Sequence, residues 1–447
     1  MKILACRLYG ENDLRLEEMD LEGAGDDAVV VELVSNSVCM SDYKAVTLAT
    51  KHKRVPKDIA TNPVMVGHEV CGIVREVGTR WRSRFHVGQH VGVQPSFNIP
   101  GHELETMGYS WATMGGDATH IRVPAVVIEQ GCLLPYDGDA FFKCSLAEPV
   151  SCIVSAFRTS YHNAFNTHIH EMGIKPNGTM LLVGGGGAMG LATVDITCHS
   201  PLNRPRRLVV TEIDEARLAH EAAVFGCAKI DDPVSRFHAR GVVNGVDVHF
   251  LLTRDLADPV AALKAINRDD GERRDNPTAT GGGYDDVFLY AADSSLFPQA
   301  SALMGFGGAL NFFAGPLDQQ FMASFNFSHV HYMGHHCVGS SGGDVKDMTD
   351  ALAWIAAGRI HPEVMVSHVG GLDSAVETTR SLTTTPGLKR LVYTGVRLPM
   401  TAIADFAEKG RTNPFFAALD RLCAANGGLW CKAAEDYLLA HAPRILP

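Results

Sequence analysis

Four side chains in the first third of the chain could hold a metal ion that takes part in chemistry. Cys39 offers a thiolate, and His68 offers an imidazole beside the carboxylate of Glu69. A further carboxylate, Glu148, lies in a Glu-Pro segment. These ligand types suit zinc, and three protein ligands leave one position open for water or a substrate oxygen. The third ligand stays undecided between Glu69 and Glu148, and Asp42 could either orient His68 or cap a helix.

A glycine-rich loop farther along the chain predicts a dinucleotide site. It contains Gly185, Gly187, Ala188, Met189 and Gly190, between a strand expected at 179–183 and a helix expected at 191–198. Such glycines allow a sharp turn, close approach to a pyrophosphate and tight packing of the helix on its strand. The N-terminus of that helix would face the phosphates with unpaired N–H groups.

An acidic residue after the next strand bears on the choice of coenzyme. Glu212 follows the strand expected at 207–211, where a carboxylate accepts hydrogen bonds from the adenosine ribose and repels a 2′-phosphate. NAD is therefore favoured over NADP. Asp214 could share this role, whereas Arg217 could instead pair with a 2′-phosphate and favour NADP.

The elements that must position these residues change in character near residue 150. Short valine-rich runs broken by glycine precede it and predict a small barrel-like β domain. Alternating strands and helices follow and predict a parallel sheet. Its expected strands are 179–183, 207–211, 228–230, 286–290 and 308–313, with a helix at 215–225, a solvated loop inserted at 265–284, a later helix at 347–357, a closing strand at 389–393, and helical segments at 401–409 and 413–440.

Composition excludes several classes of protein. The 447-residue chain is 46% hydrophobic with a net charge of −11, which argues against nucleic acid or an anionic membrane as the main partner. We find neither a signal peptide nor an apolar run long enough to span a bilayer. The 11 scattered cysteines contain no Cys-x-x-Cys pair, as expected of free thiols in a reducing cytoplasm.

The order of these motifs resembles the zinc-dependent medium-chain dehydrogenase/reductase superfamily over about residues 1–397. The resemblance is to the sorbitol dehydrogenase type, because Glu148 stands where liver-type alcohol dehydrogenases have a cysteine ligand. It implies an α/β fold with a GroES-like β-barrel catalytic domain and a Rossmann coenzyme domain. The implied boundaries are 1–155 for the catalytic domain, 156–338 for the coenzyme domain, 339–398 for a return to the catalytic domain and 399–447 for a helical C-terminal extension.

A narrower similarity is to L-sorbose-1-phosphate reductases, in segments 38–44, 310–316, 368–372 and 429–439. It implies reversible hydride transfer between a nicotinamide coenzyme and a sugar or polyol phosphate, with L-sorbose 1-phosphate going to D-glucitol 6-phosphate as the lead reaction. Zinc would polarise the substrate oxygen, and Ser41 would pass the hydroxyl proton outward, through the coenzyme ribose and Lys44. The alternatives are a dehydrogenase for an unphosphorylated polyol and a non-catalytic nucleotide-binding protein.

Two departures from the superfamily pattern matter. Residues 94–131 contain no cysteine, so one catalytic zinc and no structural zinc is expected; the spacing of His102, Glu103, Glu105 and His120 does not suit a closed zinc site. Lys44 stands where sorbitol-type relatives often have a histidine. It could relay a proton, hold an anionic substrate group together with the basic run 51–54, or be an exposed charge.

The resemblance also implies a homodimer or homotetramer. Residues 307–313 are the expected edge strand through which coenzyme domains would join. The C-terminal extension has apolar faces that need a partner surface, from this subunit or a neighbour. The residues of these faces are Phe406, Phe415, Phe416, Leu419, Trp430 and Leu438.

Overall fold

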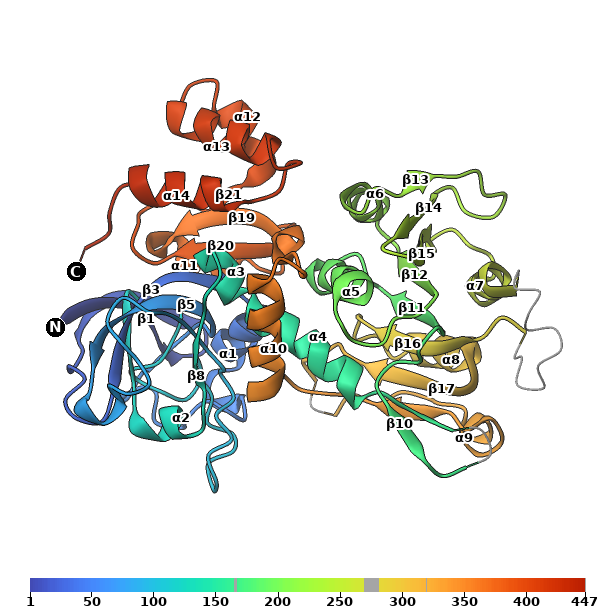
Figure 1. Ribbon diagram of the computed structural model, residues 1–447, viewed down its shortest axis with the longest axis horizontal. Helices are drawn as coiled ribbons and strands as arrows, with labels where there is room; N and C mark the ends of the chain where they lie inside the picture. The colour runs from blue at the N-terminus through green and yellow to red at the C-terminus, as the bar shows by residue number, and fades with distance from the viewer. Residues whose placement is uncertain (165–166, 269–280, 319, 447) are drawn as a thin grey trace. The chain divides into compact units, whose positions relative to one another are not determined.

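The computed structural model describes residues 1–164, 167–268, 281–318 and 320–446. The chain forms two compact units (Figure 1). Unit 1 comprises Met1–Ser151 and Asp344–Pro447, and unit 2 comprises Cys152–Gly343. Within the described ranges, no helix combines the length and apolar character that crossing a bilayer requires.

Unit 1 is built on a mixed eight-stranded sheet that joins both ends of the chain. Valine-rich β3 (Val29–Val38) pairs antiparallel with β5 (Glu69–Val77) on one side and with β20 (Lys389–Tyr393) on the other. A second, smaller sheet holds β1 (Lys2–Gly10), β2 (Asp13–Asp20) and β4 (Val64–Met65). The remaining strands of the large sheet are β6 (His90–Val93), β7 (His120–Val123), β8 (Leu133–Pro135), β19 (Val366–Gly371) and β21 (Thr401–Ala402).

Unit 2 has the parallel sheet expected from its strand–helix alternation. Its central strand β11 (Thr179–Val183) pairs in parallel with β12 (Arg207–Glu212) and with β16 (Tyr284–Leu289). These strands are almost entirely buried, as expected when both faces of a parallel sheet are covered. The helices that follow β11 and β12 are α5 (Ala188–His199) and α6 (Glu215–Val224). The α/β fold class is confirmed.

One predicted strand of unit 2 is wrong in its pairing. Segment 228–230 was expected to be the third parallel strand, but β13 (Ala228–Lys229) pairs antiparallel with β14 (His238–Val243). The strand beside β12 is β15 (Val246–Leu252), which forms a hairpin with β14. Asn244 and Gly245 make the turn, both with positive φ, 46° and 85°. Asn-Gly between two apolar runs is a strong hairpin signal, and the prediction overlooked it.

Two further expectations concern the end of this sheet and the inserted loop. The expected edge strand at 307–313 is wrong, because β17 (Met304–Phe312) is flanked by β16 and β18 (His336–Val338). The true edge, β18, is too short to stand out in the sequence. Of the loop expected at 265–284, residues 269–280 lie outside the described residues, and the helix α7 (Pro259–Arg268) extends to residue 268.

The C-terminal extension packs on unit 1. It contains α12 (Phe406–Lys409), α13 (Pro414–Ala424) and α14 (Lys432–His441), drawn in red in Figure 1. Trp430 is fully buried; its ring lies 6.1 Å from that of Tyr393 and 6.4 Å from that of Phe406. Much of the apolar surface of the extension is therefore covered by this subunit.

A buried carboxylate fixes this packing. Glu435 on α14 accepts hydrogen bonds from the backbone N–H groups of Phe141 and Phe142, each at 2.8 Å, and from the Tyr393 hydroxyl at 3.0 Å. The two N–H groups belong to the first turn of α3 (Phe141–Ser145). Burial raises the pKa of Glu435 to about 7, although the three donors favour the ionised form.

We expect Glu435→Gln to lower the free energy of unfolding by about 1–3 kcal/mol. The glutamine NH₂ group would face backbone donors and leave a buried N–H without an acceptor. Chemical denaturation measures the loss. Asp436→Asn is the matched control, because Asp436 lies on the same helix in an exposed ion pair with Lys432 and should change stability by less than about 0.5 kcal/mol. Equal stability of the two variants would contradict this role of Glu435.

Candidate metal centre and coenzyme loop

The structure brings three of the predicted ligands together in unit 1. One ligand atom from each of Cys39, His68 and Glu69 lies within 4.8 Å of the others. Cys39 follows β3 directly, Glu69 is the first residue of the neighbouring β5, and His68 immediately precedes it. Ser37 is paired with Glu69 in the antiparallel register, so the end of one strand meets the beginning of the other. Sheet pairing therefore assembles the donors.

Gly67 is required for this approach. Its φ is +92°, and a Cβ there would lie 2.7 Å from the backbone nitrogen of Asp117 and 2.9 Å from the side-chain nitrogen of Asn36. A side chain would be excluded both by the backbone conformation and by these neighbours. The glycine of the Gly-His-Glu segment thus allows His68 to enter the buried site.

Asp42 holds two of the donors at once. Its Oδ2 accepts the backbone N–H of Cys39 at 2.9 Å, and its Oδ1 lies 2.8 Å from Nδ1 of His68. Both roles considered for this residue, helix cap and partner of His68, are therefore present together. Burial alone would lower the pKa of His68, but the Asp42 carboxylate raises it well above its usual value. Nε2, the other ring nitrogen, lies 3.3 Å from the Ser41 hydroxyl.

Lys389, which the sequence analysis missed, lies in this donor group. It is buried at the start of β20, and its ammonium forms an ion pair with Oε1 of Glu69. Burial alone would lower the pKa of Lys389, but the charges of Cys39, Glu69 and Glu148 raise it. The second oxygen of Glu69, Oε2, is buried with no hydrogen-bond partner among the described residues.

Glu148 is near this group without being part of it. It is buried in the first turn of α4 (Ala147–Thr159), and its charge acts on Lys389. Its carboxylate does not belong to the cluster of ligand atoms formed by Cys39, His68 and Glu69. Of the two carboxylates considered as third ligand, it is therefore Glu69 that lies within 4.8 Å of the donor atoms of Cys39 and His68.

Lys44 and Tyr109 flank the donor group. Lys44 is half-buried on α1 (Met40–Leu48), and burial lowers its pKa. Tyr109 is buried, with its ring 5.5 Å from that of His68. The sequence analysis missed Tyr109, because an isolated tyrosine in a loop gives no signal of its position.

The glycine loop of unit 2 has the expected geometry. Gly187 caps α5, which begins at Ala188 and Met189. A Cβ on Gly190 would collide with the carbonyl oxygen of Gly185, so only glycine permits the helix to pack this closely on the loop. The first turn of α5 thus follows a sharp bend at the end of β11.

Glu212 lies against this loop. Its Oε2 accepts the backbone N–H of Gly186 at 3.0 Å, and its Oε1 accepts that of Ile213 at 2.7 Å. Asp214 caps α6 through the N–H groups of Ala216 and Arg217. The Arg217 side chain is half-exposed, 4.0 Å from the Asp214 carboxylate. Glu212 therefore contacts the glycine-rich loop directly, whereas the Asp214 side chain is used to cap α6.

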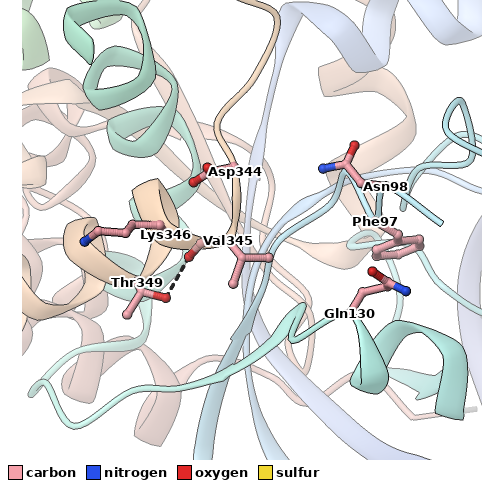
Figure 2. Close-up of a pocket in the computed structure, with 7 residues that line it drawn as sticks. All are labelled: Phe97, Asn98, Gln130, Asp344, Val345, Lys346 and Thr349. Atoms are coloured by element: carbon pink, nitrogen blue, oxygen red, sulfur yellow. Dashed lines mark hydrogen bonds between the residues drawn. The ribbon is translucent and has the colours of Figure 1, made fainter. Parts of the chain in front are cut away.

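The remaining polar residues of the 94–131 segment lie apart from the donor group. His102 contacts Glu105 at 2.8 Å on the surface, Glu103 accepts the N–H of Gly101, and His120 lies on β7. A pocket of about 550 Å³ also opens here, between Phe97 and the start of α10 (Val345–Ala356) (Figure 2). None of the predicted site residues lines this pocket.

Comparison with known proteins identifies the family of the chain. Residues 25–131 match the family described as alcohol dehydrogenase GroES-like domain. The chain is 42% identical to mannitol-1-phosphate 5-dehydrogenase of Aliivibrio fischeri, over 97% of each protein. It is 38% identical to L-sorbose 1-phosphate reductase of Klebsiella pneumoniae, over 99% of this chain and 98% of that one.

A solved structure extends the match to the fold. A zinc-binding dehydrogenase from Sinorhizobium meliloti, bound to NADP, superposes with a TM-score of 0.64 and 20% identity, covering 88% of this chain and 100% of that one. Near full-length relatives and this shared fold lead to one conclusion. The chain is an oxidoreductase that belongs to the zinc-dependent medium-chain dehydrogenase/reductase family.

Proposed function

We propose that this enzyme transfers a hydride between a nicotinamide coenzyme and the secondary alcohol or ketone of an open-chain sugar phosphate. The lead reaction is reduction of L-sorbose 1-phosphate to D-glucitol 6-phosphate. The observation that carries the chemistry is the buried group of Cys39, His68 and Glu69. The substrate class is supported by two near full-length relatives, one named for a polyol phosphate and one for a sugar phosphate.

The residues present fit a zinc ion. A thiolate, an imidazole and a carboxylate form a donor set that zinc prefers. Oε2 of Glu69 is buried and lacks a hydrogen-bond partner among the described residues, a costly arrangement that a bound cation would relieve. Asp42 holds His68 through Nδ1, which leaves Nε2 for a metal. Lys389 offsets part of the buried negative charge, and a divalent cation would offset more.

The geometry favours Glu69 over Glu148 as the third ligand. Lys389 occupies Oε1 of Glu69, so Oε2 can turn to the metal without breaking that ion pair. Glu148 would then lie outside the set of direct zinc ligands, although it is close enough for its charge to raise the pKa of Lys389. From there it could bind a water or the substrate.

Side chains around the donor group would handle the proton that accompanies hydride transfer. When bound, zinc supplies a Lewis acid that polarises the substrate oxygen. Ser41, whose hydroxyl lies 3.3 Å from Nε2 of His68, would exchange a proton with that oxygen. Lys44 lies on the same helix, α1, and its lowered pKa suits either onward transfer of the proton or attraction of an anionic group.

Two other substrate assignments remain candidates. The relative with the higher identity is named for mannitol 1-phosphate, whose oxidation at C5 gives D-fructose 6-phosphate. An unphosphorylated polyol is the other alternative. Initial rates of NADH and NADPH oxidation with L-sorbose 1-phosphate, D-fructose 6-phosphate, L-sorbose and D-fructose test all three. Faster turnover of the free sugars would overturn the sugar-phosphate proposal.

Removal of one thiolate tests the metal centre. We expect Cys39→Ser to lose most of its zinc, because a serine hydroxyl is a far poorer zinc ligand than a thiolate. The measurement is zinc content by mass spectrometry, with NADH binding followed by fluorescence to show that the nucleotide site persists. Cys337→Ser, at an exposed cysteine, is the control and should keep wild-type zinc. Wild-type zinc content in Cys39→Ser would contradict the ligand assignment.

Lys44 is expected to interact with the phosphate of the substrate. We predict that Lys44→Ala raises KM for L-sorbose 1-phosphate roughly tenfold, as for loss of a charged hydrogen bond, and KM for L-sorbose much less. Steady-state kinetics with both sugars measures the difference. Equal effects on the two substrates would show that Lys44 does not recognise phosphate, and a fall in kcat with both would assign it to proton transfer.

The coenzyme preference follows from Glu212. We expect NADH to have a lower KM than NADPH, because the buried carboxylate beside Gly186 would repel a 2′-phosphate. Glu212→Gln should reduce this discrimination. A wild-type preference for NADPH that is lost in Arg217→Gln would instead assign the specificity to Arg217 and overturn the NAD proposal.

A further inference from the structure

The Tyr109 ring connects the donor group to a basic segment of the chain. It lies 5.5 Å from the ring of His68 and stacks on the ring of His52 at 5.3 Å. The guanidinium carbon of Arg54 lies over the same ring, 5.7 Å from its centroid. All four residues belong to unit 1. A cationic side chain is thus held one aromatic ring away from a proposed zinc ligand.

Arg54 differs from the other cations of the 51–54 run. Lys51 is exposed and paired with Glu11 at 2.7 Å, and Lys53 is exposed. Arg54 is half-buried, and its Nε is shielded from solvent without a hydrogen-bond partner among the described residues. In the part of the chain that the structure describes, no carboxylate lies within ion-pair distance of it. A half-buried guanidinium without a counter-ion is a site for an anion.

The backbone around Arg54 is anchored. Its carbonyl oxygen accepts the Ser110 hydroxyl at 2.7 Å, which ties the basic segment to the residue after Tyr109. Its backbone N–H donates to Nδ1 of His52 at 3.2 Å. The backbone that carries the guanidinium is therefore fixed by the fold before any ligand binds, which lowers the entropy cost of binding.

His52 adds a neutral hydrogen-bond donor to this group. Burial, together with the charges of Arg54, Lys53 and Lys44, lowers its pKa to about 4. The imidazole is therefore neutral near pH 7. Because Nδ1 accepts the Arg54 N–H, the ring proton is on Nε2, which can donate to a ligand.

We propose that Arg54, supported by His52 and Lys44, forms the subsite that binds the phosphate group of the substrate. The inference rests on the proposed function, since it requires a phosphorylated substrate. A guanidinium offers two parallel N–H donors that match two phosphate oxygens. A lysine ammonium acts as a point charge and cannot form this pair of parallel hydrogen bonds. Tyr109 supplies the wall between the phosphate subsite and the reacting carbon.

The test compares phosphorylated and free substrates in three variants. Arg54→Gln removes the charge and keeps most of the side chain over Tyr109, and Arg54→Lys keeps the charge without the fork. Lys53→Gln, at the exposed neighbour, is the matched control. KM is measured for L-sorbose 1-phosphate, L-sorbose and NADH, and binding of D-glucitol 6-phosphate and D-glucitol is measured by calorimetry. Zinc content and melting temperature establish that each variant is folded and loaded.

Arg54→Gln is expected to raise KM for L-sorbose 1-phosphate and to weaken D-glucitol 6-phosphate binding by roughly 10- to 100-fold, the range for a lost charged hydrogen bond. KM for L-sorbose and for NADH should stay at the wild-type value. Arg54→Lys should recover part of the loss, and Lys53→Gln should resemble the wild type. If Arg54→Gln instead raised KM for NADH, Arg54 would bind a coenzyme phosphate and the proposal would be overturned.

The experiment separates this inference from the function on which it rests. A wild-type preference for the phosphorylated sugar that persists in Arg54→Gln would remove the subsite and leave the sugar-phosphate function standing. If the wild-type enzyme showed no such preference, both the phosphate subsite and the sugar-phosphate function would be overturned. L-sorbose 1-phosphate carries its phosphate next to the carbonyl carbon, and D-fructose 6-phosphate carries it at the far end of the chain. If Arg54→Gln raised KM for only one of these two sugar phosphates, the result would show which phosphate position Arg54 binds and would support the subsite.

Discussion

The buried ion pair between Lys389 and Glu69 holds unit 1 together at the point where its chemistry is proposed to occur. The two residues are 320 positions apart in the chain. They begin β20 and β5, the two strands that flank β3, and β3 leads directly into Cys39. Breaking a buried ion pair from one side leaves an uncompensated charge, which costs about 3–5 kcal/mol. The C-terminal part of the chain is therefore needed to form the donor group.

Asp42 shows how few residues this arrangement requires. One carboxylate caps α1 through the Cys39 N–H and contacts Nδ1 of His68 through its other oxygen. Helix formation and imidazole orientation thus depend on the same side chain, so α1 cannot shift without moving His68. In a site where atoms must be held to within fractions of an ångström, such sharing replaces a larger set of supporting contacts.

Site residues that belong to short sequence motifs could be predicted, whereas those whose contacts are with residues distant in the chain could not. Cys39, His68 and Glu69 lie in short motifs, and the loop ending at Gly190 stands between a recognisable strand and helix. Lys389 looked only like the first residue of a strand, because nothing in its neighbourhood records a partner 320 residues away. The basic run 51–54 was recognised as a candidate anion site, but the contact of Arg54 with the Tyr109 ring joins separate loops, and periodicity and spacing do not reveal it.

The strand pairing of unit 2 was mispredicted for a related reason. The segment 228–230, Ala-Lys-Ile, is too short for its composition to distinguish a parallel from an antiparallel strand. The turn at Asn244 and Gly245 carried the missing information. The expected edge at 307–313 failed because β18 has only three residues, below the length at which a strand pattern can be recognised in the sequence.

The two carboxylates considered as the third ligand have separate supports, and this gives the C-terminal extension a defined role. Glu69 is held by sheet pairing and by Lys389 at the start of β20. Glu148 follows closely after α3, whose first-turn N–H groups are bound by Glu435 of the extension. Tyr393, at the other end of β20, donates to the same Glu435 carboxylate and accepts the indole N–H of Trp430. The extension therefore contacts both β20 and α3. Through β20 it supports the position of Glu69, and through α3 it supports the position of Glu148.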